Sequence, residues 1–371
     1  MQTISGAIQR SRSSPTLPVG KLPARLFAAL LRKVASRDPR VIIGPGVGWD
    51  CAVVRAVGQR LLVFKADPIT FASEEIAWYL VQVNANDLAT TGAHPRWLLV
   101  TMLLPEGQTT PDLVQGIATG LNAACRKIGA SVIGGHTEVT HGLGRPILAG
   151  TLVGEVDRAR LITPRGARPG DRLLLTKGVP IEATAILARE FAERLASVLS
   201  AAQLRKAQAF LQKPGISILR DAHIAVRAGK VTAMHDPTEG GLVMALWELA
   251  QASRRSIWFD PSTVQIPTLA ATVCAAFGLD PLRAIASGAL LLTAGKLSAA
   301  KIRRAFESEG IPCTEIGGVE CGPPRLWQVC GGHRGRLEPP LRDELARVFD
   351  AMPIQNRAVF TASGNSVENP L

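Results

Sequence analysis

Four aspartates stand where their carboxylates could act together on a ligand. One ends a glycine-rich stretch, two follow short apolar runs of strand type, and one lies inside a predicted helix that is otherwise suited to burial. A buried carboxylate is costly unless it is paired or bound to a metal, so each of them is a candidate site residue. The four are Asp50, Asp67, Asp87 and Asp236.

The surroundings of two of these aspartates add polar groups. Asp50 ends the stretch GPGVGWD at 44–50, whose glycines let the backbone approach a ligand closely or point its amides at an anion. Asp87 is spaced three or four residues from Asn84 and Thr91, so the three side chains share one helix face. Both segments therefore predict a polar site.

Two glycine-rich segments resemble phosphate-binding turns. Asp236 opens DPTEGG at 236–241, where a strand ends and a helix is expected to begin near residue 239, and helix N-termini with adjacent glycines attract anions. GGHTE at 134–138 is expected to form a similar turn. Carboxylates facing such turns suit Mg²⁺ and a polyphosphate. A single aspartate of this kind more often caps a turn or helix, whereas four together favour a site.

Six motifs occur in a fixed order along the chain, and as a set they resemble the aminoimidazole ribonucleotide (AIR) synthetase superfamily. The similarity runs from residue 20 to about residue 320, and its closest branch is the hydrogenase maturation factor-like, or synthetase-related, proteins. That placement is supported by VNANDLATTGAHPRW, RPGDRLLLTKG and DPTEGGLVMALWELA. The six motifs are GPGVGWDCAVV, KADPIT, NANDLATTGAHP, GGHTEV, DPTEGG and GLDPL…SGALLL.

The resemblance implies a two-domain α/β (α+β) fold and a homodimer whose N-terminal domains pair into a β-barrel. It also implies ATP in a cleft between the domains, with Mg²⁺ on the phosphates. The implied metal ligands are Asp50, Asp67, Asp87 and Asp236, with Asp50, Asp67 and Lys65 taking part in catalysis. The implied nucleotide contacts are Asn84, Gly135, Thr137, Thr238, Gly240 and Gly241.

Several positions depart from the superfamily pattern. Trp49 stands where an acidic residue is common, which removes a possible second metal ligand. His136 stands where some members carry Asp, and we expect a turn or substrate contact there, because one imidazole among oxygen donors suits magnesium poorly. No cysteine follows Cys330 and none occurs in residues 1–50, so we expect neither the thiocyanate-forming self-modification nor selenophosphate synthesis.

The elements that must position these residues alternate between strands and helices. Thr110 followed by Pro111 predicts a helix start, and that helix should end at Gly129. The expected first-half elements are helices at 20–36, 73–91 and 110–128 and strands at 41–43, 52–57, 61–65, 97–103, 130–133 and 146–156. The expected second-half elements are strands at 172–176, 231–234, 257–259, 289–292 and 314–319 and helices at 181–197, 201–212, 217–228, 239–252, 268–277, 298–309 and 341–349.

This pattern divides the chain into domains. We expect a basic arm at 1–19, a nucleotide-binding and dimerisation domain at 20–160, a linker at 161–171, a second domain at 172–335 and a tail at 336–371. The first-domain strands carry more apolar positions than one covering layer of helices needs, which favours burial against a second copy. The termini at 1–19 and 362–371 should be dispensable for nucleotide binding. The alternative is that the arm closes over the phosphates.

Composition excludes several classes. The 371 residues are 47% hydrophobic, with 42 basic against 30 acidic side chains and 5% aromatics. The basic residues accompany no nucleic-acid-binding motif, and no apolar run reaches the ~20 residues that span a bilayer. Six scattered cysteines without a C-x-x-C pair fit a reducing, cytoplasmic protein without disulfides. We expect no nucleic-acid partner and no membrane partner, but a small-molecule or protein acceptor substrate.

The resemblance to the synthetase superfamily implies an ATP-dependent enzyme that phosphorylates an amide or carbonyl oxygen and so turns it into a leaving group. One alternative is a small-molecule kinase similar to thiamine-monophosphate kinase. Another is a nucleotide-binding partner protein without turnover, for which Trp49 is the main argument.

Overall fold

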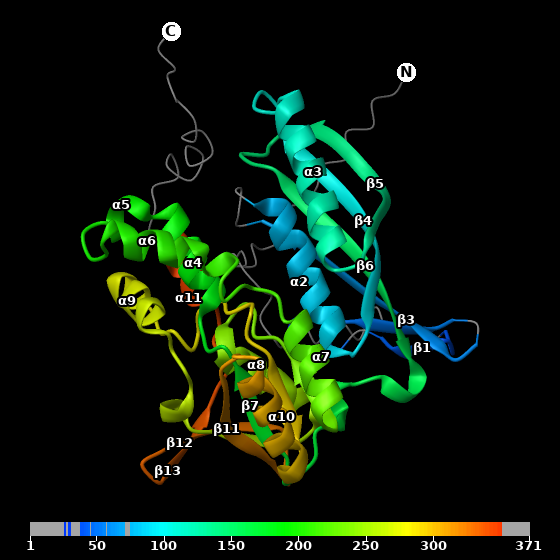
Figure 1. Ribbon diagram of the computed structural model, residues 1–371, viewed down its shortest axis with the longest axis vertical. Coiled ribbons are helices and arrows are strands. Elements are labelled where there is room, and N and C mark those ends of the chain that lie inside the picture. The colour runs from blue at the N-terminus through cyan, green and yellow to red at the C-terminus, as the bar shows by residue number, and fades with distance from the viewer. Residues whose placement is uncertain are drawn as a thin grey trace, which may run out of the picture.

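The computed structural model describes residues 26, 29–30, 38–44, 46–56, 58–70 and 75–350. The expected helix at 20–36 lies almost wholly outside this set, as do the arm at 1–19 and the last part of the tail, so those predictions stay untested. Figure 1 shows two sheets, each accompanied by helices.

The N-terminal domain is a six-stranded sheet in the order β1-β2-β3-β6-β4-β5, with two helices on one face (Figure 1). All neighbouring strands are antiparallel except β4 and β5. Its elements are β1 Val41–Ile43, β2 Ala52–Arg55, β3 Arg60–Ile69, α2 Ile76–Thr90, β4 His94–Pro105, α3 Pro111–Lys127, β5 Ser131–Thr140 and β6 Ile147–Asp157.

The C-terminal domain is a seven-stranded sheet in the order β13-β12-β9-β11-β7-β10-β8. Its strands are β7 Arg172–Thr176, β8 Val231–His235, β9 Ser256–Phe259, β10 Leu291–Ala294, β11 Cys313–Glu320, β12 Arg325–Cys330 and β13 His333–Leu337. Its helices are α4 Ile181–Glu190, α5 Ala192–Leu195, α6 Ala201–Gln208, α7 Leu219–Ala228, α8 Gly241–Ser253, α9 Thr268–Phe277, α10 Lys296–Ser308 and α11 Glu344–Asp350. Short 3-10 turns are η1 Arg158–Arg160, η2 Pro164–Gly166, η3 Ala209–Leu211 and η4 Pro261–Thr263.

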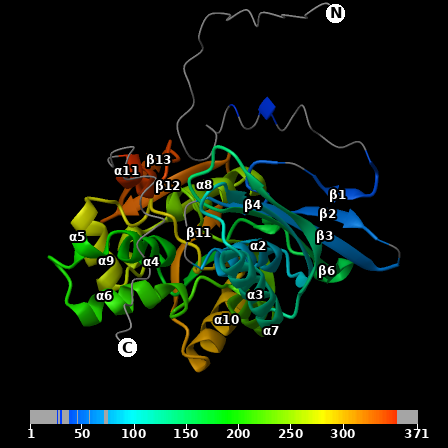
Figure 2. The ribbon, with the colours of Figure 1, turned by 90° about the horizontal axis from the view of Figure 1, so that it is seen from above.

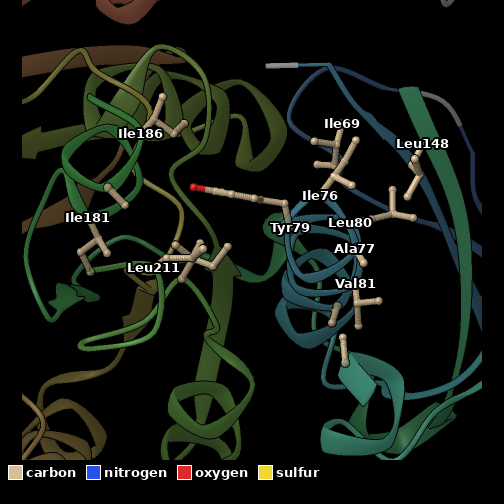
Figure 3. Close-up of a cluster of buried hydrophobic side chains, with 14 of the residues drawn as sticks. Ile69, Ile76, Ala77, Tyr79, Leu80, Val81, Leu148, Ile181, Ile186 and Leu211 are labelled. Carbon is tan, nitrogen blue, oxygen red and sulfur yellow. The ribbon is translucent and has the colours of Figure 1, made fainter. Parts of the chain in front are cut away.

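Helix α2 is the element shared by the two domains. Figures 1 and 2 place it between the N-terminal sheet and the C-terminal domain, and it packs against β3, β6 and α3 on one side and α7 and β8 on the other. Figure 3 shows Leu80 on its sheet side, whereas Tyr79 points toward Ile181 and Ile186 of α4. These residues belong to one continuous apolar cluster, so the domain interface is itself a core.

Local signals predicted several elements well. The Thr110 side chain accepts a hydrogen bond from the Leu113 N–H at 3.2 Å and caps α3, which begins at Pro111 and ends beside Gly129 as expected. Strand β7 and helix α9 match their predicted bounds residue for residue. The family-level expectation of a mixed, two-domain α+β fold is therefore confirmed.

Three predictions about strands were wrong. Strand β3 does not end at Lys65 but runs to Ile69, because β6 pairs with it on both sides of Pro68 and one missing donor does not end a strand. Strands β12 and β13 were missed; β12 lies within the predicted second domain, and β13 crosses its predicted end at residue 335.

The segment 134–138 is likewise part of a strand and not a turn. Strand β5 passes through it, with an irregular register against β4 opposite Leu98 and Leu99. A Cβ at Gly135 would stand 1.8 Å from the Val100 carbonyl oxygen, so the glycine allows close strand pairing. Its role here is structural.

The sheet face away from α2 and α3 is uncovered and partly apolar along β4. Trp97 and Leu99, which alternate with the buried Leu98 and Val100, lie on this face and are 38% and 41% exposed. Val132 and Val139 of β5 pair with Leu98 and Leu104 and so lie on the helix side, yet they are 41% and 56% exposed. β5 is also an edge strand, and nearly all of its residues are exposed. The described residues form an open sheet and not a closed barrel.

Candidate functional site

The loop that carries Asp50 is fixed against helix α8 of the other domain. Gly48 adopts a φ of 72°, and a Cβ there would stand 2.4 Å from the Glu248 carbonyl oxygen. The ring of Trp49 lies against Gly46, with the Arg165 guanidinium 4.9 Å from its centre. Only glycine permits this approach at position 48, and Trp49 serves as the packing residue that leads into Asp50.

Strand β3 presents Lys65 and Asp67 on one face. Side chains two residues apart on a strand point the same way, and this face, shared with Leu61 and Val63, is turned toward α2. The Lys65 Nζ lies 3.0 Å from Asp67 Oδ2. The alternation of the strand therefore places a cation and an anion side by side against the helix.

Helix α2 contributes Asn84 and Asp87, both buried. The Asn84 side chain accepts a hydrogen bond from the Asp67 N–H at 3.1 Å and donates to the Asp67 carbonyl at 3.4 Å. It thus holds the Asp67 backbone along the stretch of β3 that lies beyond the end of β2. Asp87 Oδ2 lies 3.0 Å from the same Lys65 Nζ.

Asp236 follows β8 and is 1% exposed. Among the described residues, no nitrogen or hydroxyl group donates a hydrogen bond to either of its carboxylate oxygens, and its hydrogen-bond partner is the carboxyl group of Asp87. Burial raises the pKa of Asp236 to about 6, and the neighbouring Asp50 carboxylate adds to the shift. Two oxygens without donors in so buried a place are an arrangement that a cation would complete.

His235 links the two domains and was not among the predicted site residues. Its Nδ1 lies 3.0 Å from Asp50 Oδ2, and its Nε2 lies 3.0 Å from Glu248 Oε2 of α8. Burial lowers the His235 pKa, but the two carboxylates outweigh burial and raise it well above 6.5. Its place directly before Asp236 at a strand end was an available signal, whereas nothing in the sequence pointed to Glu248.

The four predicted aspartates converge on one place. The carboxyl group of Asp87 interacts electrostatically with those of Asp236, Asp67 and Asp50 as well as with Lys65. Burial raises its pKa well above the ordinary value, although Lys65 opposes the shift. With Glu248 the group holds five carboxylates against two cationic side chains, Lys65 and His235.

The donor set fits a hard divalent cation. Asp50, His235 and Asp236 each offer one ligand atom within 4.8 Å of the others. Magnesium prefers carboxylate oxygen and is commonly held by only one or two carboxylates, so Asp50 and Asp236 suffice. His235 already uses both nitrogens on Asp50 and Glu248.

The turn at the start of α8 is arranged as predicted, but its amide is engaged. Gly240 and Gly241 have φ of 81° and 63°, and a Cβ at Gly241 would clash with the carbonyl oxygens of Leu282 and Ala284. The Gly240 N–H donates to Asp343 Oδ2 at 2.6 Å. The carbonyl of Thr238 accepts from the Gly241 N–H. A carboxylate thus lies where a phosphate was expected.

Within one chain, Gly135 and Thr137 are not brought to the aspartates. They lie on β5, which β4 and β6 separate from β3, or about 14 Å at ordinary strand spacing. His136 is exposed there and pairs with Glu138. Cys51, in contrast, is buried as expected, and burial raises the pKa of its thiol well above 9.0, which excludes a thiolate nucleophile at neutral pH.

Two mixed domains that close on one buried group of carboxylates define a two-domain enzyme of the synthetase type. The family follows from sequence models: the N-terminal domain of AIR synthase related proteins matches residues 48–156, and the C-terminal domain matches residues 168–324. The chain belongs to this family and is one of its hydrogenase-maturation-like members.

Individual relatives agree with this assignment. A putative hydrogenase expression/formation protein of Methanocaldococcus jannaschii is 29% identical over 73% of this chain and 80% of its own length. The carbamoyl dehydratase HypE of Azotobacter vinelandii is 27% identical over 88% of this chain and 92% of its own length.

Solved structures show the same fold. The HypE–HypF complex matches with a TM-score of 0.68 at 17% identity, over 85% of this chain and all of that one. AaThiL complexed with AMPPCP and TMP matches with a TM-score of 0.67 at 21% identity, over 88% and 98%. In the part of the chain that is described, no helix is both long and apolar enough to cross a membrane.

Proposed function

We propose that this protein is a magnesium- and ATP-dependent enzyme that activates an amide or carbonyl oxygen by phosphorylating it. The observation that carries the proposal is the convergence of Asp50, Asp67, Asp87 and Asp236 on one buried place, where both oxygens of Asp236 lack a nitrogen or hydroxyl donor among the described residues. Carboxylates from both domains around one cation suit the positioning of a nucleoside triphosphate between the domains.

Each side chain has a task in this proposal. Asp50 and Asp236 hold the divalent ion, which when bound neutralises charge on the phosphates. Asp67 and Asp87 hold the Lys65 ammonium at the same site, where it can stabilise charge on the transferred phosphoryl group. Asn84 fixes the Asp67 backbone, and His235 holds Asp50 in place.

The substrate class follows from the relatives. Relatives of the hydrogenase maturation type include carbamoyl dehydratases. An amide oxygen takes the terminal phosphoryl group of ATP, with ADP as leaving group. The C–O bond then breaks, inorganic phosphate leaves with that oxygen, the amide nitrogen loses its two protons, and a nitrile remains. We therefore propose a carbamoyl or primary-amide acceptor.

A second candidate is transfer of the phosphoryl group to a small molecule that keeps it. The observation in its favour is the fold of AaThiL, which matches about as well as the HypE–HypF complex. The third candidate is a nucleotide-binding protein without turnover. Trp49 packs on Gly46 beside an intact set of aspartates, and this supports an active enzyme.

The decisive experiment measures ADP and inorganic phosphate from ATP and Mg²⁺, with and without carbamoylated and primary-amide acceptors. Equal amounts of ADP and phosphate, released faster with an amide acceptor, support the main proposal. ADP without free phosphate supports a kinase. No nucleotide turnover and no Mg²⁺-dependent ATP binding by calorimetry would overturn both.

We also propose a homodimer formed through the open face of the N-terminal sheet. The support is Trp97 and Leu99, exposed on that face, together with the exposed edge strand β5, since an uncovered face with an open edge strand gains by burial against a second copy. In such a dimer, Gly135 and Thr137 would lie next to the second copy of the chain.

A substitution that introduces one charge at this surface tests the proposed dimer. Ile133→Asp, at a side chain 57% exposed on β5, should yield monomers in light scattering. Val198→Asp, 52% exposed in the C-terminal domain, is the matched control and should leave the particle mass unchanged. A wild-type protein that is already monomeric at micromolar concentration would contradict the proposal.

A further inference from the structure

Lys65 differs from an ordinary paired lysine in what surrounds its ammonium group. Its Nζ lies 3.0 Å from Asp67 Oδ2 and 3.0 Å from Asp87 Oδ2, so one charge is shared by two carboxylates. Its side chain is 16% exposed, and that of Asp87 is 4% exposed. Surface pairs are screened and worth little, but the Lys65–Asp87 half of this bridge lies mostly away from water, whereas the Asp67 side chain is 35% exposed.

The strand and helix leave the ammonium little freedom. Lys65 and Asp67 project from the same face of β3, and α2 lies directly over that face. The Asn84 amide holds the backbone of Asp67 from the helix side. The position between the two carboxylates is therefore built by secondary structure and not by a mobile side chain on a loop.

In the other half of the group, the internal cation reaches only one of the two carboxylates. His235 Nδ1 lies 3.0 Å from Asp50 Oδ2 but 4.0 Å from Asp236, and both oxygens of Asp236 lack a nitrogen or hydroxyl donor among the described residues. Two neighbouring positions thus differ: one between Asp67 and Asp87 that holds an ammonium, and one between Asp50 and Asp236 that suits a divalent ion.

We propose that the Lys65 ammonium permanently takes one of two cation positions in this site, so that the protein binds a single divalent ion beside Asp50 and Asp236. Asp87 lies between the two cations. The inference rests on the proposed function, because it divides the proposed metal ligands into two groups. It predicts that the second position becomes a metal site as soon as the lysine is removed.

The physical reason is charge and geometry. Without the ammonium, Asp67 and Asp87 would face each other with no counter-ion, and an uncompensated buried charge is strongly destabilising. Carboxylate pairs are suitable ligands for hard divalent cations. Lys65→Met keeps the length and apolar stem of the side chain but removes its charge, and so vacates the position without removing a carboxylate.

The experiment measures how many Mn²⁺ ions each chain binds. Full-length wild-type protein is mixed with a non-hydrolysable ATP analogue and titrated with Mn²⁺, and electron paramagnetic resonance measures the concentration of the free ion. We expect about one Mn²⁺ per chain for wild type and about two for Lys65→Met. Lys301→Met, at an exposed position of α10, is the matched control and should bind as wild type does.

If Lys65→Met folds only when metal is bound, a second variant still allows the proposal to be tested. Combined Lys65→Met and Asp67→Asn removes one cation and one anion together and should return to about one Mn²⁺. The melting temperature of Lys65→Met should rise more steeply with Mn²⁺ than that of wild type or the double variant, since ligands that bind only the folded state stabilise it.

The outcomes separate this inference from the proposed function. Two ions in wild type, or one ion in Lys65→Met with the wild-type melting response, would overturn the role of Lys65 and leave the proposed function intact. No Mn²⁺ bound by any variant would overturn both.

Discussion

Among the described residues, Lys65 and Lys177 are mostly buried lysines with carboxylate partners, and only Lys177 belongs to a group whose charges are all paired. Lys177 of the C-terminal domain pairs with Asp221 at 3.0 Å and donates to the Ser217 carbonyl at 2.7 Å. Asp221 in turn accepts from the Thr176 hydroxyl. That group is complete within itself.

Lys65, in contrast, stands in a group with too many carboxylates. One Lys65 ammonium serves both Asp67 and Asp87, and both oxygens of the neighbouring Asp236 lack a nitrogen or hydroxyl donor among the described residues. Incomplete pairing at a buried place is costly, and a folded protein retains it where a ligand completes it. The comparison shows that burial and ion pairing alone do not identify a binding site. A binding site is indicated by buried carboxylates that outnumber the cations beside them.

The largest effect is expected at the complete pair. Lys177→Met leaves Asp221, whose side chain is 2% exposed, without its charge partner and should lower the free energy of unfolding by about 3–5 kcal/mol. Because the pair holds no metal position, added Mg²⁺ should not restore the loss. Urea denaturation with and without Mg²⁺ measures it, and recovery by Mg²⁺ would remove the contrast with Lys65.

Glu182 is a buried carboxyl group for which the described residues show no ion pair, and it lies between these two extremes. It is 4% exposed and accepts hydrogen bonds from the Ser287 N–H, at 3.3 Å, and from the Ser287 side chain; burial raises its pKa to about 7. The folded state then binds the proton more tightly than the unfolded state, so this group's contribution falls as pH rises from about 4.5 to about 7 and is level above.

Glu182→Gln removes that dependence while keeping an acceptor for Ser287. We expect the variant to gain up to about 3 kcal/mol over wild type between pH 4.5 and pH 8. Denaturant unfolding at both pH values is the measurement. An equal difference in stability at the two pH values would contradict a proton on Glu182.

Removing an oxygen from the incomplete group should affect turnover. Asp236→Asn should lower the rate of ATP turnover about 100-fold or more, because it removes a proposed ligand of the divalent ion. Asp157→Asn, on an exposed side chain at the end of β6, is the control and should leave the rate unchanged. Equal rates for both variants would show that the donor-free oxygens play no part in catalysis.

The smallest effect is expected at the start of α8. Asp343→Asn keeps one acceptor oxygen, enough for either the Gly240 or the Leu345 N–H group, and removes a negative charge where a phosphate is predicted. ATP should bind about threefold to tenfold more tightly, or by up to about 1.4 kcal/mol. Calorimetry measures the Kd for ATP. An unchanged Kd would indicate that the phosphates bind away from Gly240.

Predictions from sequence succeeded where chemistry is local. The cap of Thr110 and the proline after it fixed the start of α3, and the ordered motifs gave the family, which the domain matches confirm. They failed where distant partners decide. Whether 134–138 is a turn or a strand depends on β4, and whether Pro68 ends a strand depends on β6.

The sequence by itself determined which residues could hold a cation and a phosphate, because glycines, aspartates and their flanking apolar runs follow local rules. Only the tertiary structure decided that carboxylates from a loop, a strand, a helix and a second domain meet in one place. It also decided that Lys65 shares its charge between Asp67 and Asp87 and that Asp343 engages the Gly240 N–H. Those contacts join segments far apart in the chain, and their energies depend on burial and on the sum of neighbouring charges, which no single stretch of sequence contains.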